Sequence, residues 1–279
     1  MRAALAAAAL AAVLVPPDAR AVERPLWEAG VGATGLYLPD YRGANQGRGY
    51  VFPIPYFVYR GDHFKVDREG IRGIFLQSDR VELDVSVFGT PPVDSSDNDA
   101  RQGMPDLDAT LEIGPVLVFT LARDRRIDYN YRLQLRLPAR TAIATDLSHW
   151  HNIGWTFYPH LNLDIRPELF GQRWNVGFSL GPAYATQNFH EYFYGVPTQF
   201  ATPQRPAYTA RGGYSGATFV AGISRRFEKF WVGAYVRYDN LSGAVFENSP
   251  LVKQNYAIAG GIAFAWVFAE SGTKVISPD

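Results

Sequence analysis

The sequence predicts an all-β fold, a transmembrane antiparallel up-and-down β-barrel, and three observations predict it. Apolar and polar residues alternate over long segments such as Ile127–Leu137 and Ile153–Ile165, whereas strands of soluble proteins run only ~5–6 residues and tilted membrane-crossing strands need ~9–11. Short and long connectors alternate, as periplasmic turns and extracellular loops do. Tryptophans near predicted strand ends fit aromatic girdles; they are Trp27, Trp150, Trp174, Trp231 and Trp266.

A soluble sandwich with its apolar faces turned inward is the alternative architecture. The strand lengths disfavour it, because a sandwich has no need of strands long enough to cross a bilayer. A helical membrane protein is disfavoured too. The longest apolar run after the start of the chain, Tyr256–Phe268, is shorter than the ~18–20 residues that a spanning helix needs.

The first 21 residues are predicted to be a secretory signal peptide. Arg2 gives a positive start, residues 3–15 form an uninterrupted apolar run, and Ala19-Arg20-Ala21 is an A-x-A cleavage site. We therefore expect three parts: a signal peptide over residues 1–21, an outer-membrane barrel over residues 22–268, and a C-terminal tail over residues 269–279.

Twelve strands are predicted in the barrel, and ten remain if one hairpin is dropped. Each is a run of alternating, β-branched or aromatic residues bounded by turn residues, and no segment sustains a helical period. An even number places both chain ends in the periplasm. In chain order the segments are Trp27–Leu38, Val51–Arg60, His63–Asp67, Ile71–Gln77, Val81–Val87, Leu107–Leu121, Ile127–Leu137, Ile153–Ile165, Trp174–Tyr184, Tyr214–Phe227, Phe230–Asn240 and Tyr256–Phe268.

The connectors divide into two sets. The short ones, predicted to face the periplasm, are Ala122–Arg126, Arg166–Gly171 and Arg226–Lys229. The long ones, predicted to be extracellular, are Pro91–Pro105, Ala139–Asn152, Thr186–Gly213 and Ser242–Asn255. The connector Thr186–Gly213 is rich in aromatic residues and long enough to fold over the mouth of the barrel.

Charged residues of both signs fall on the polar faces of the strands, which would turn toward the lumen. They include Glu82, Asp84, Asp108, Glu112, Asp128, Arg132, Arg136, Asp164, Arg237 and Asp239. A turn at Ala122–Arg126 would place Glu112 opposite Arg136, which predicts an ion pair between them. The mixed charges favour a lumen braced by ion pairs over an open channel.

Composition excludes several classes of protein. The 27 Lys and Arg residues balance 27 Asp and Glu residues, whereas a nucleic-acid-binding protein needs a basic surplus. The chain has no cysteine, so disulfides, thiolate nucleophiles and cysteine-ligated metals are excluded.

Four sequence features resemble functional sites, and each has a structural explanation that we prefer. Carboxylates near Asn98 and Arg101 could hold calcium, but they fit no EF-hand spacing and suit a solvated loop; they are Asp94, Asp97, Asp99, Asp106 and Asp108. The group Ser148, His149 and His151 suggests a barrel hydrolase, yet nothing in the sequence supplies an acid or an oxyanion donor.

The other two features are aromatic and glycine-rich. His190 with Glu191 and Tyr192–Tyr194 reads as a loop element packed into the barrel mouth. Gly30, Gly32 and Gly35 form no phosphate motif and indicate close packing or kinks in a strand. We therefore predict no catalytic, cofactor-binding or metal-ligating residue, no cofactor, and no enzymatic activity.

The mature chain closely resembles the MipA/OmpV family of outer-membrane proteins over essentially its whole length. Near the start the resemblance is carried by Trp27–Gly32, Leu38–Gly43, Pro53–Tyr56 and Tyr59–Asp62. Its most specific stretch comprises Pro92–Ser95, Asn98, Ala100–Arg101, Gly103–Asp108 and Leu111–Pro115. Trp266–Phe268 looks like the terminal aromatic signature that the barrel assembly machinery reads, although residues 269–279 follow it here.

This resemblance implies a non-enzymatic protein of the Gram-negative outer membrane. Some members of the family are scaffolds that join a lytic transglycosylase to a penicillin-binding protein during growth of the peptidoglycan. Such partners could reach only the short turns, such as 123–126 and 225–229, and the two chain ends. A small-solute pore and a surface adhesin are the alternative functions.

Overall fold

The computed structural model describes residues 23–61, 64–67, 70–73, 76–77, 80–124 and 130–276. The predicted signal peptide, residues 1–21, lies outside the described residues. Within them the fold is all-β, as predicted, and no helix is both long and apolar enough to cross a bilayer.

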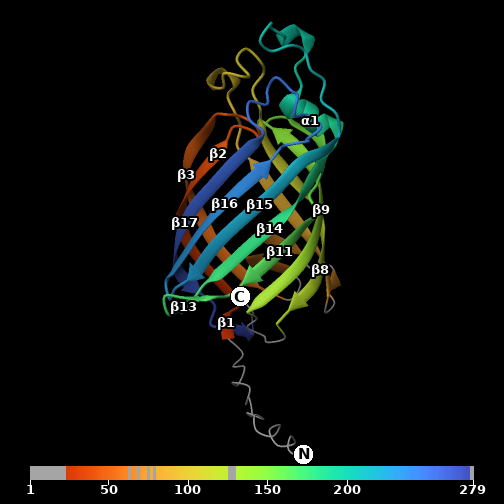
Figure 1. Cartoon of the computed structure of the whole chain (residues 1–279). Helices are drawn as coiled ribbons and strands as arrows, with labels where there is room; N and C mark the ends of the chain where they lie inside the picture. The colour runs from red at the N-terminus through yellow and green to blue at the C-terminus, as the bar shows by residue number, and fades with distance from the viewer. Residues whose placement is uncertain are drawn as a thin grey trace, which may run out of the picture.

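One antiparallel sheet curves into a barrel-shaped wall (Figure 1). Strand β2, the first long strand, pairs with β17, the last one. In the series of paired strands, β5 stands at one end and lies against β7, which is near the other end. Its strands are β2 (Trp27–Pro39), β3 (Gly47–Arg60), β4 (Phe64–Asp67), β5 (Gly70–Gly73), β6 (Leu76–Gln77), β7 (Val81–Thr90), β8 (Ala109–Arg123), β9 (Tyr131–Thr145), β10 (Trp150–Phe157), β11 (His160–Ile165), β14 (Asn175–Ala185), β15 (Gly213–Arg226), β16 (Phe230–Asn240) and β17 (Tyr256–Glu270).

The described part of this sheet has fourteen strand segments, more than the twelve predicted. The predicted strand Ile153–Ile165 is divided into β10 and β11 at Tyr158 and Pro159, because proline has no N–H for the ladder. Both pieces pair with the same neighbours, β9 and β14. The predicted strand Ile71–Gln77 corresponds to β5 and β6. A count of twelve therefore stays a prediction.

Two local predictions were wrong. The segment Ala139–Asn152 is not a long loop, because β9 continues to Thr145 and β10 begins at Trp150, which leaves only residues 146–149 between them. The chain also contains a short helix that the sequence did not predict, α1 (Gln187–Tyr194). An eight-residue helix is too short to give a sustained helical pattern.

The wall has its large apolar side chains outside and small or polar ones inside. On β17 the side chains of Ile258, Ile262 and Phe264 are exposed, while those of Ala257 and Ala265 are fully buried. This arrangement is the reverse of a soluble protein and suits a surface that faces lipid.

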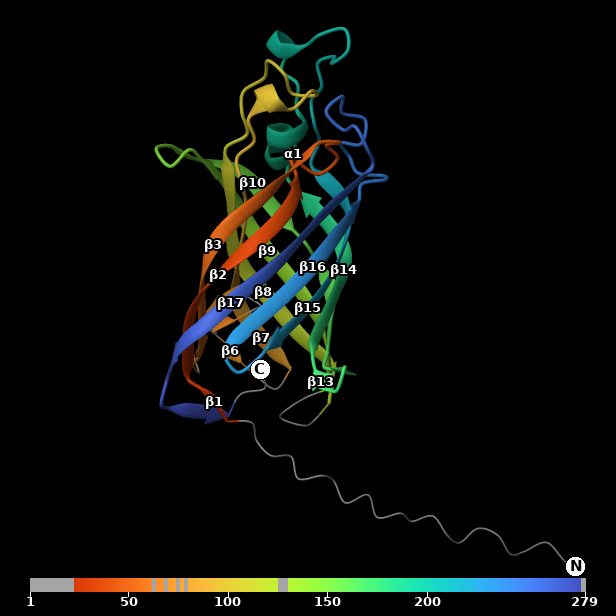
Figure 2. The ribbon, with the colours of Figure 1, turned by 90° about the vertical axis from the view of Figure 1, so that its left-hand side faces the viewer.

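The two ends of the barrel differ (Figure 2). One end, here named the cap end, carries α1 and the short helices η1 (Ser95–Asp97) and η2 (Thr198–Phe200). The opposite end, named the terminal end, carries a two-stranded sheet of β1 (Glu23–Pro25) and β18 (Lys274–Ile276), and a hairpin of β12 (Glu168–Leu169) and β13 (Gln172–Arg173). Strand β17 runs two residues beyond the predicted barrel end at Phe268, and part of the predicted tail pairs with β1.

Candidate functional site

The largest buried apolar core lies at the cap end, in loops rather than in the wall. Four loops contribute to it: residues 40–46, 91–108, 186–212 and 241–255. Its largest fully buried apolar side chains include Leu241, Phe246 and Leu251, and the Tyr194 ring stacks on Phe246 with centroids 3.7 Å apart. We call this cluster, with the loops that form it, the cap. The prediction that Thr186–Gly213 folds over the mouth is confirmed.

His190 lies at the centre of the cap and is fully buried. Its Nδ1 is 2.6 Å from the Arg211 carbonyl oxygen, which can only accept, so Nδ1 carries the proton. Its Nε2, 2.7 Å from Ser215 Oγ, then accepts from that hydroxyl. Burial, assisted by the charge of Arg42, lowers the pKa of His190, although the hydrogen bond to Arg211 acts in the opposite direction. The prediction of a loop element packed into the mouth is confirmed, and the ring is a neutral structural group.

Two buried arginines tie the loops of the cap together through backbone carbonyls. Arg101 donates to the carbonyl oxygens of Pro105 (3.0 Å) and Phe193 (3.3 Å). Arg205 donates to those of Ala100 (3.0 Å) and Phe200 (2.9 Å). Loop carbonyls that would otherwise be buried without a donor are thereby satisfied.

Three acidic residues of loop 91–108 make contacts that fix the loop and its place on the barrel. Asp94 caps η1 by accepting from the Ser96 amide (2.8 Å), and Asp106 accepts from the Ser95 amide (2.7 Å). Asp97 forms an ion pair with Arg48 at 3.3 Å. In the part of the chain that the structure describes, no group of three or more His, Cys, Asp or Glu side chains is placed to hold a metal ion. The contacts favour a structural loop over a calcium site.

Ser148 and His149 lie on the short exposed hairpin loop, and His151 follows in β10. The Asp146 carboxylate accepts from the backbone amides of Ser148 and His149 and lies 3.2 Å from His149 Nδ1. These bonds, those from His149 foremost, lower the pKa of Asp146 to about 2. The arrangement is a carboxylate-capped turn, and it does not align the His149 ring on a serine.

Below the cap, ion pairs join neighbouring parts of the inner wall. Asp239 on β16 accepts from Arg42 Nε (3.1 Å) and Arg237 Nε (2.8 Å), which links loop 40–46 to the wall. Glu112 on β8 accepts from the Thr156 hydroxyl (2.6 Å) and lies 3.9 Å from Arg140 Nη1. We name these five charged residues, Arg42, Glu112, Arg140, Arg237 and Asp239, the charge belt. The predicted bracing by opposite charges is confirmed.

The predicted partner of Glu112 was wrong. Glu112 stands opposite Ala142 in the ladder, and Arg136 stands opposite Val118. The cause is the connection between the strands: β8 continues to Arg123 and β9 begins only at Tyr131, later than the assumed turn. Moving the turn shifts every pair along both strands.

Further ion pairs lie toward the terminal end. Glu28, almost fully buried on β2, is held by Arg60 Nη2 (3.1 Å) and Arg226 Nε (2.8 Å). Arg132 Nη2 lies 3.2 Å from Asp164 Oδ2, to which Asn162 also donates at 3.0 Å. Glu28 and Arg42 have no partner that the sequence pattern could reveal, because a single charge in a strand or a loop gives no information about which distant charge it meets.

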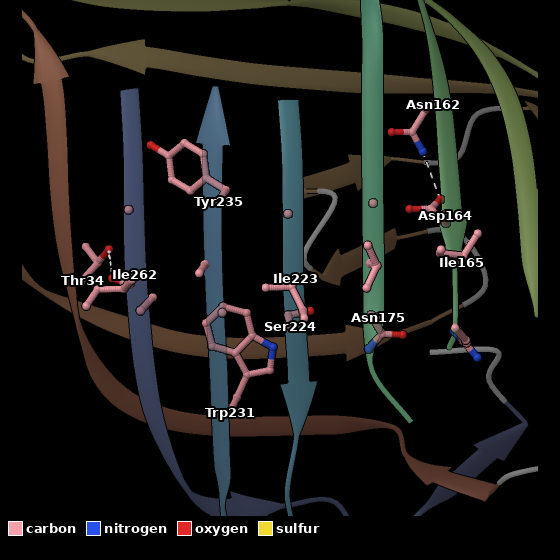
Figure 3. A pocket seen from close by; sticks show the side chains of 18 of the residues that line it. Thr34, Asn162, Asp164, Ile165, Asn175, Ile223, Ser224, Trp231, Tyr235 and Ile262 are labelled. Carbon is pink, nitrogen blue, oxygen red and sulfur yellow. Dashed lines mark hydrogen bonds between the residues drawn. The ribbon is translucent and has the colours of Figure 1, made fainter. Parts of the chain in front are cut away.

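A cavity of about 400 Å³ lies beside these pairs, against β11 and β14–β17 (Figure 3). Among its lining residues are Asp164, Asn175, Ser224, Trp231 and Tyr235. Trp231 was predicted to belong to an outer aromatic girdle, and this was wrong. Its ring contacts Tyr56, whose hydroxyl reaches Glu28 inside the barrel.

Two of the three glycines singled out on β2 lie in close contact with the neighbouring strand. A Cβ on Gly30 or Gly32 would collide with the carbonyl oxygens of Trp266 or Phe264 on β17. A Cβ on Gly35 would meet only Ile262 Cγ1, at 3.8 Å. Close packing is thus confirmed for Gly30 and Gly32 and not for Gly35.

Comparison with known proteins gives one family match. A family model described as MltA-interacting protein MipA matches residues 31–268. No curated protein matches the chain.

Solved structures give further similarities. OprB of Pseudomonas putida is 10% identical with a TM-score of 0.36; the match covers 78% of this chain and 49% of that one, so the chain spans about half its length. A FadL homologue of Pseudomonas aeruginosa is 10% identical, with a TM-score of 0.33, and the match covers 87% of this chain and 89% of that one. The outer membrane protein OprG of Pseudomonas aeruginosa is 12% identical, with a TM-score of 0.24, and the match covers 88% of this chain and 97% of that one.

Proposed function

We propose, from the fact that this chain belongs to the MltA-interacting protein family, that it is a non-enzymatic outer-membrane β-barrel with a structural or scaffolding role. In this proposal the barrel sits in the lipid of the outer membrane of a Gram-negative cell. Its partners are the lytic and synthetic enzymes of the peptidoglycan. The family's name supports a lytic transglycosylase as partner, and the resemblance adds a penicillin-binding protein.

The packing of the cap carries this proposal. A pore needs a continuous aqueous path, and among the described residues the cap end holds the larger apolar core, with the charge belt beneath it. A barrel filled in this way is better suited to anchor and display surfaces than to pass solutes.

The hairpin of β12 and β13 is the surface that we propose for the protein partner. In the proposal the terminal end faces the periplasm, since the first and last described strands, β1 and β18, pair there (Figures 1 and 2). At the tip of the hairpin, Phe170 is 96% exposed and holds a φ of 55°, a left-handed conformation that is costly for an aromatic residue. Strained residues concentrate at functional sites, and exposed aromatic side chains often anchor protein interfaces.

A matched pair of variants tests this assignment. Leu147, in the loop at the cap end, is the other described non-glycine residue with positive φ; it is 84% exposed. Asparagine tolerates this conformation, so Phe170→Asn and Leu147→Asn both remove an exposed apolar side chain without adding strain. The protein, purified from envelope membranes in detergent, is immobilised and used to capture peptidoglycan enzymes from solubilised envelopes.

We expect the unmodified protein and Leu147→Asn to capture a lytic transglycosylase, and Phe170→Asn to capture at least about tenfold less, the effect of a typical interface anchor. Failure of the unmodified protein to capture any peptidoglycan enzyme would contradict the scaffold role. Equal capture by both variants would contradict only the choice of the hairpin.

Two alternatives remain as further proposals. A small-solute pore predicts large, steady channels in a planar bilayer, whereas the filled cap predicts small or absent conductance. An adhesin predicts binding through the outer surface of the cap, for example around η2, which capture by whole host cells or matrix proteins would detect.

A further inference from the structure

The cavity in the terminal half of the lumen is built by two adjacent rows of residues that run across the strands. In the first row the ladders place Asp164, Gly177, Gly222, Tyr235 and Gly261 side by side on β11, β14, β15, β16 and β17. Three glycines in one row leave a hollow in the inner face of the wall.

The second row continues the hollow toward the terminal end. Here Asn175, Ser224, Gly233, Ala263 and Thr34 stand side by side on β14–β17 and β2. All five side chains are small. The volume of about 400 Å³ falls within the ~300–1,000 Å³ that small-molecule sites usually have.

Glycines in these rows also make room for two aromatic rings. A Cβ on Gly233 would meet Trp231 Cζ2 at 2.8 Å, and a Cβ on Gly261 would meet Leu36 Cδ2 at 2.5 Å and Tyr235 Cε1 at 3.0 Å. Each ring therefore lies close to a glycine, where a larger residue would displace it. Both aromatic residues line the cavity (Figure 3).

Polar side chains line the cavity together with the rings of Trp231 and Tyr235. Among the residues that the structure describes, the Asn175 amide, the Ser224 hydroxyl and the Tyr235 hydroxyl make no hydrogen bond with protein, although all three line the cavity. The Asp164 carboxylate is held in place by Arg132 and Asn162. The site thus offers donors and acceptors in fixed positions around an aromatic floor.

The cavity is also bounded on its cap side. The charge belt lies between the cavity and the cap, where Arg237 on β16 extends to the Phe88 ring on β7, with its Cζ 5.9 Å from the ring centroid, and the buried core of the cap lies beyond it. A solute that reaches the cavity from the terminal end would be retained there and not passed through, which suits a binding site.

We propose that this cavity binds a small saccharide of one or two pyranose rings. The apolar C–H face of a pyranose packs on aromatic rings, and its hydroxyl groups form hydrogen bonds with carboxylate, amide and hydroxyl side chains. Trp231 and Tyr235 supply the rings, and Asp164, Asn175 and Ser224 supply the polar contacts. These contacts could bind either the end of a cell-wall glycan or a free sugar. The inference goes beyond the scaffold role and does not depend on a protein partner.

Calorimetric titration of the protein tests the proposal. The protein is purified in lauryldimethylamine oxide, since a maltoside detergent would compete, and is titrated with N,N′-diacetylchitobiose and with maltose. We expect at least one disaccharide to bind with a Kd below about 1 mM. Binding of the first identifies an N-acetylated, cell-wall type of glycan, and binding of maltose alone identifies a free sugar. If neither binds at about 10 mM, the proposal is overturned.

Filling the cavity supplies the control. A Cβ at Gly222 would meet nothing closer than 3.6 Å, so Gly222→Leu begins without a backbone clash and directs its side chain toward the hollow. Gly49, on β3, also has open space, and Gly49→Leu is the matched control on the outer side of the wall. We expect about tenfold weaker binding for Gly222→Leu and unchanged binding for Gly49→Leu. Ser224→Leu fills the same hollow from the next row if Gly222→Leu does not fold. Unchanged affinity in a folded cavity-filling variant would overturn the assignment.

Discussion

The rings of Tyr194 and Phe246 stack face to face, with centroids 3.7 Å apart and planes within 6° of parallel. Tyr194 ends α1 in loop 186–212, and Phe246 belongs to loop 241–255. The Tyr194 hydroxyl donates to the Arg42 carbonyl oxygen in a third loop, at 3.0 Å. One aromatic pair therefore holds three loops of the cap together.

Replacing Phe246 is expected to loosen the cap and leave the wall intact. Phe246 is fully buried, so Phe246→Ala should cost about 3–5 kcal/mol of cap stability through lost contacts and an unfilled cavity. We expect rapid proteolytic cleavage within residues 186–212 and a measurable rise in single-channel conductance. Phe230→Ala, on the outer face of β16, should leave both unchanged. A protease-resistant Phe246→Ala variant would contradict the central role of this ring.

The cap is expected to weaken in acid because of His190. Its folded pKa lies below the unfolded value of ~6.5, since burial disfavours the charged ring. The unfolded chain then binds more protons, so the stabilisation is fully present above pH ~6.5 and is lost as the pH falls toward the folded pKa, by at most ~1.4 kcal/mol per pH unit. Limited proteolysis between pH 7.5 and 5 measures this loss.

Glutamine variants identify the responsible histidine. His190→Gln should flatten the pH dependence of cap proteolysis, because glutamine does not titrate. His149→Gln, at an exposed position beside Asp146, should leave the dependence as in the unmodified protein. The same acid sensitivity in His190→Gln would assign the effect to another group.

Two adjacent residues of β17 are expected to differ in how much an arginine destabilises the barrel. Ile262 is 69% exposed on the outer face near the middle of the strand, so Ile262→Arg should lower the free energy of unfolding in lipid vesicles by about 2–4 kcal/mol. Ala263 faces the lumen between Gly233 and Thr34, where Ala263→Arg should cost about 1 kcal/mol or less. Urea titration in vesicles measures both, and equal costs would argue against a lipid-facing outer surface.

Glycines on β2 provide a test of strand packing. A Cβ at position 32 would collide with the Phe264 carbonyl oxygen, so Gly32→Ala should destabilise the barrel by about 1–3 kcal/mol, as overpacking does. Gly35→Ala meets only a side chain at 3.8 Å and should fold like the unmodified protein. The yield of folded, heat-modifiable protein after refolding measures the difference. A normal yield for Gly32→Ala would show that β2 and β17 can separate locally.

Much of the wall could be predicted from the sequence, because the side that a strand residue faces depends only on its position in the alternation. Gln134 and Leu135 show this: Gln134 is 1% exposed inside the barrel, while Leu135 lies on the opposite face of β9. Such information is local, so each of the twelve predicted segments corresponds to strand in the structure.

The failure at Ala139–Asn152 has a tertiary cause. In the upper part of β9 the inward residues Ala142 and Ala144 are apolar, because Phe189 of α1 packs against them. The alternation of polar and apolar residues disappears there, so the strand looked like a loop. The helix α1, whose packing allows apolar residues on the inner face of β9, lies more than forty positions later in the chain.

The sequence by itself determined that this protein is an all-β barrel with apolar residues outside, charges of both signs inside and an aromatic loop able to reach the mouth. Only the tertiary structure decided which charges meet. Glu112 contacts Arg140 and not Arg136, and Asp239 pairs with Arg42, because turn position and bulges shift the register of whole strands. The same holds for the cap and the cavity. Their residues meet across separations such as the 210 positions between Tyr41 and Leu251 in the cap and the 228 between Thr34 and Ile262 in the cavity. Alternation along one strand carries no information about contacts made so far along the chain.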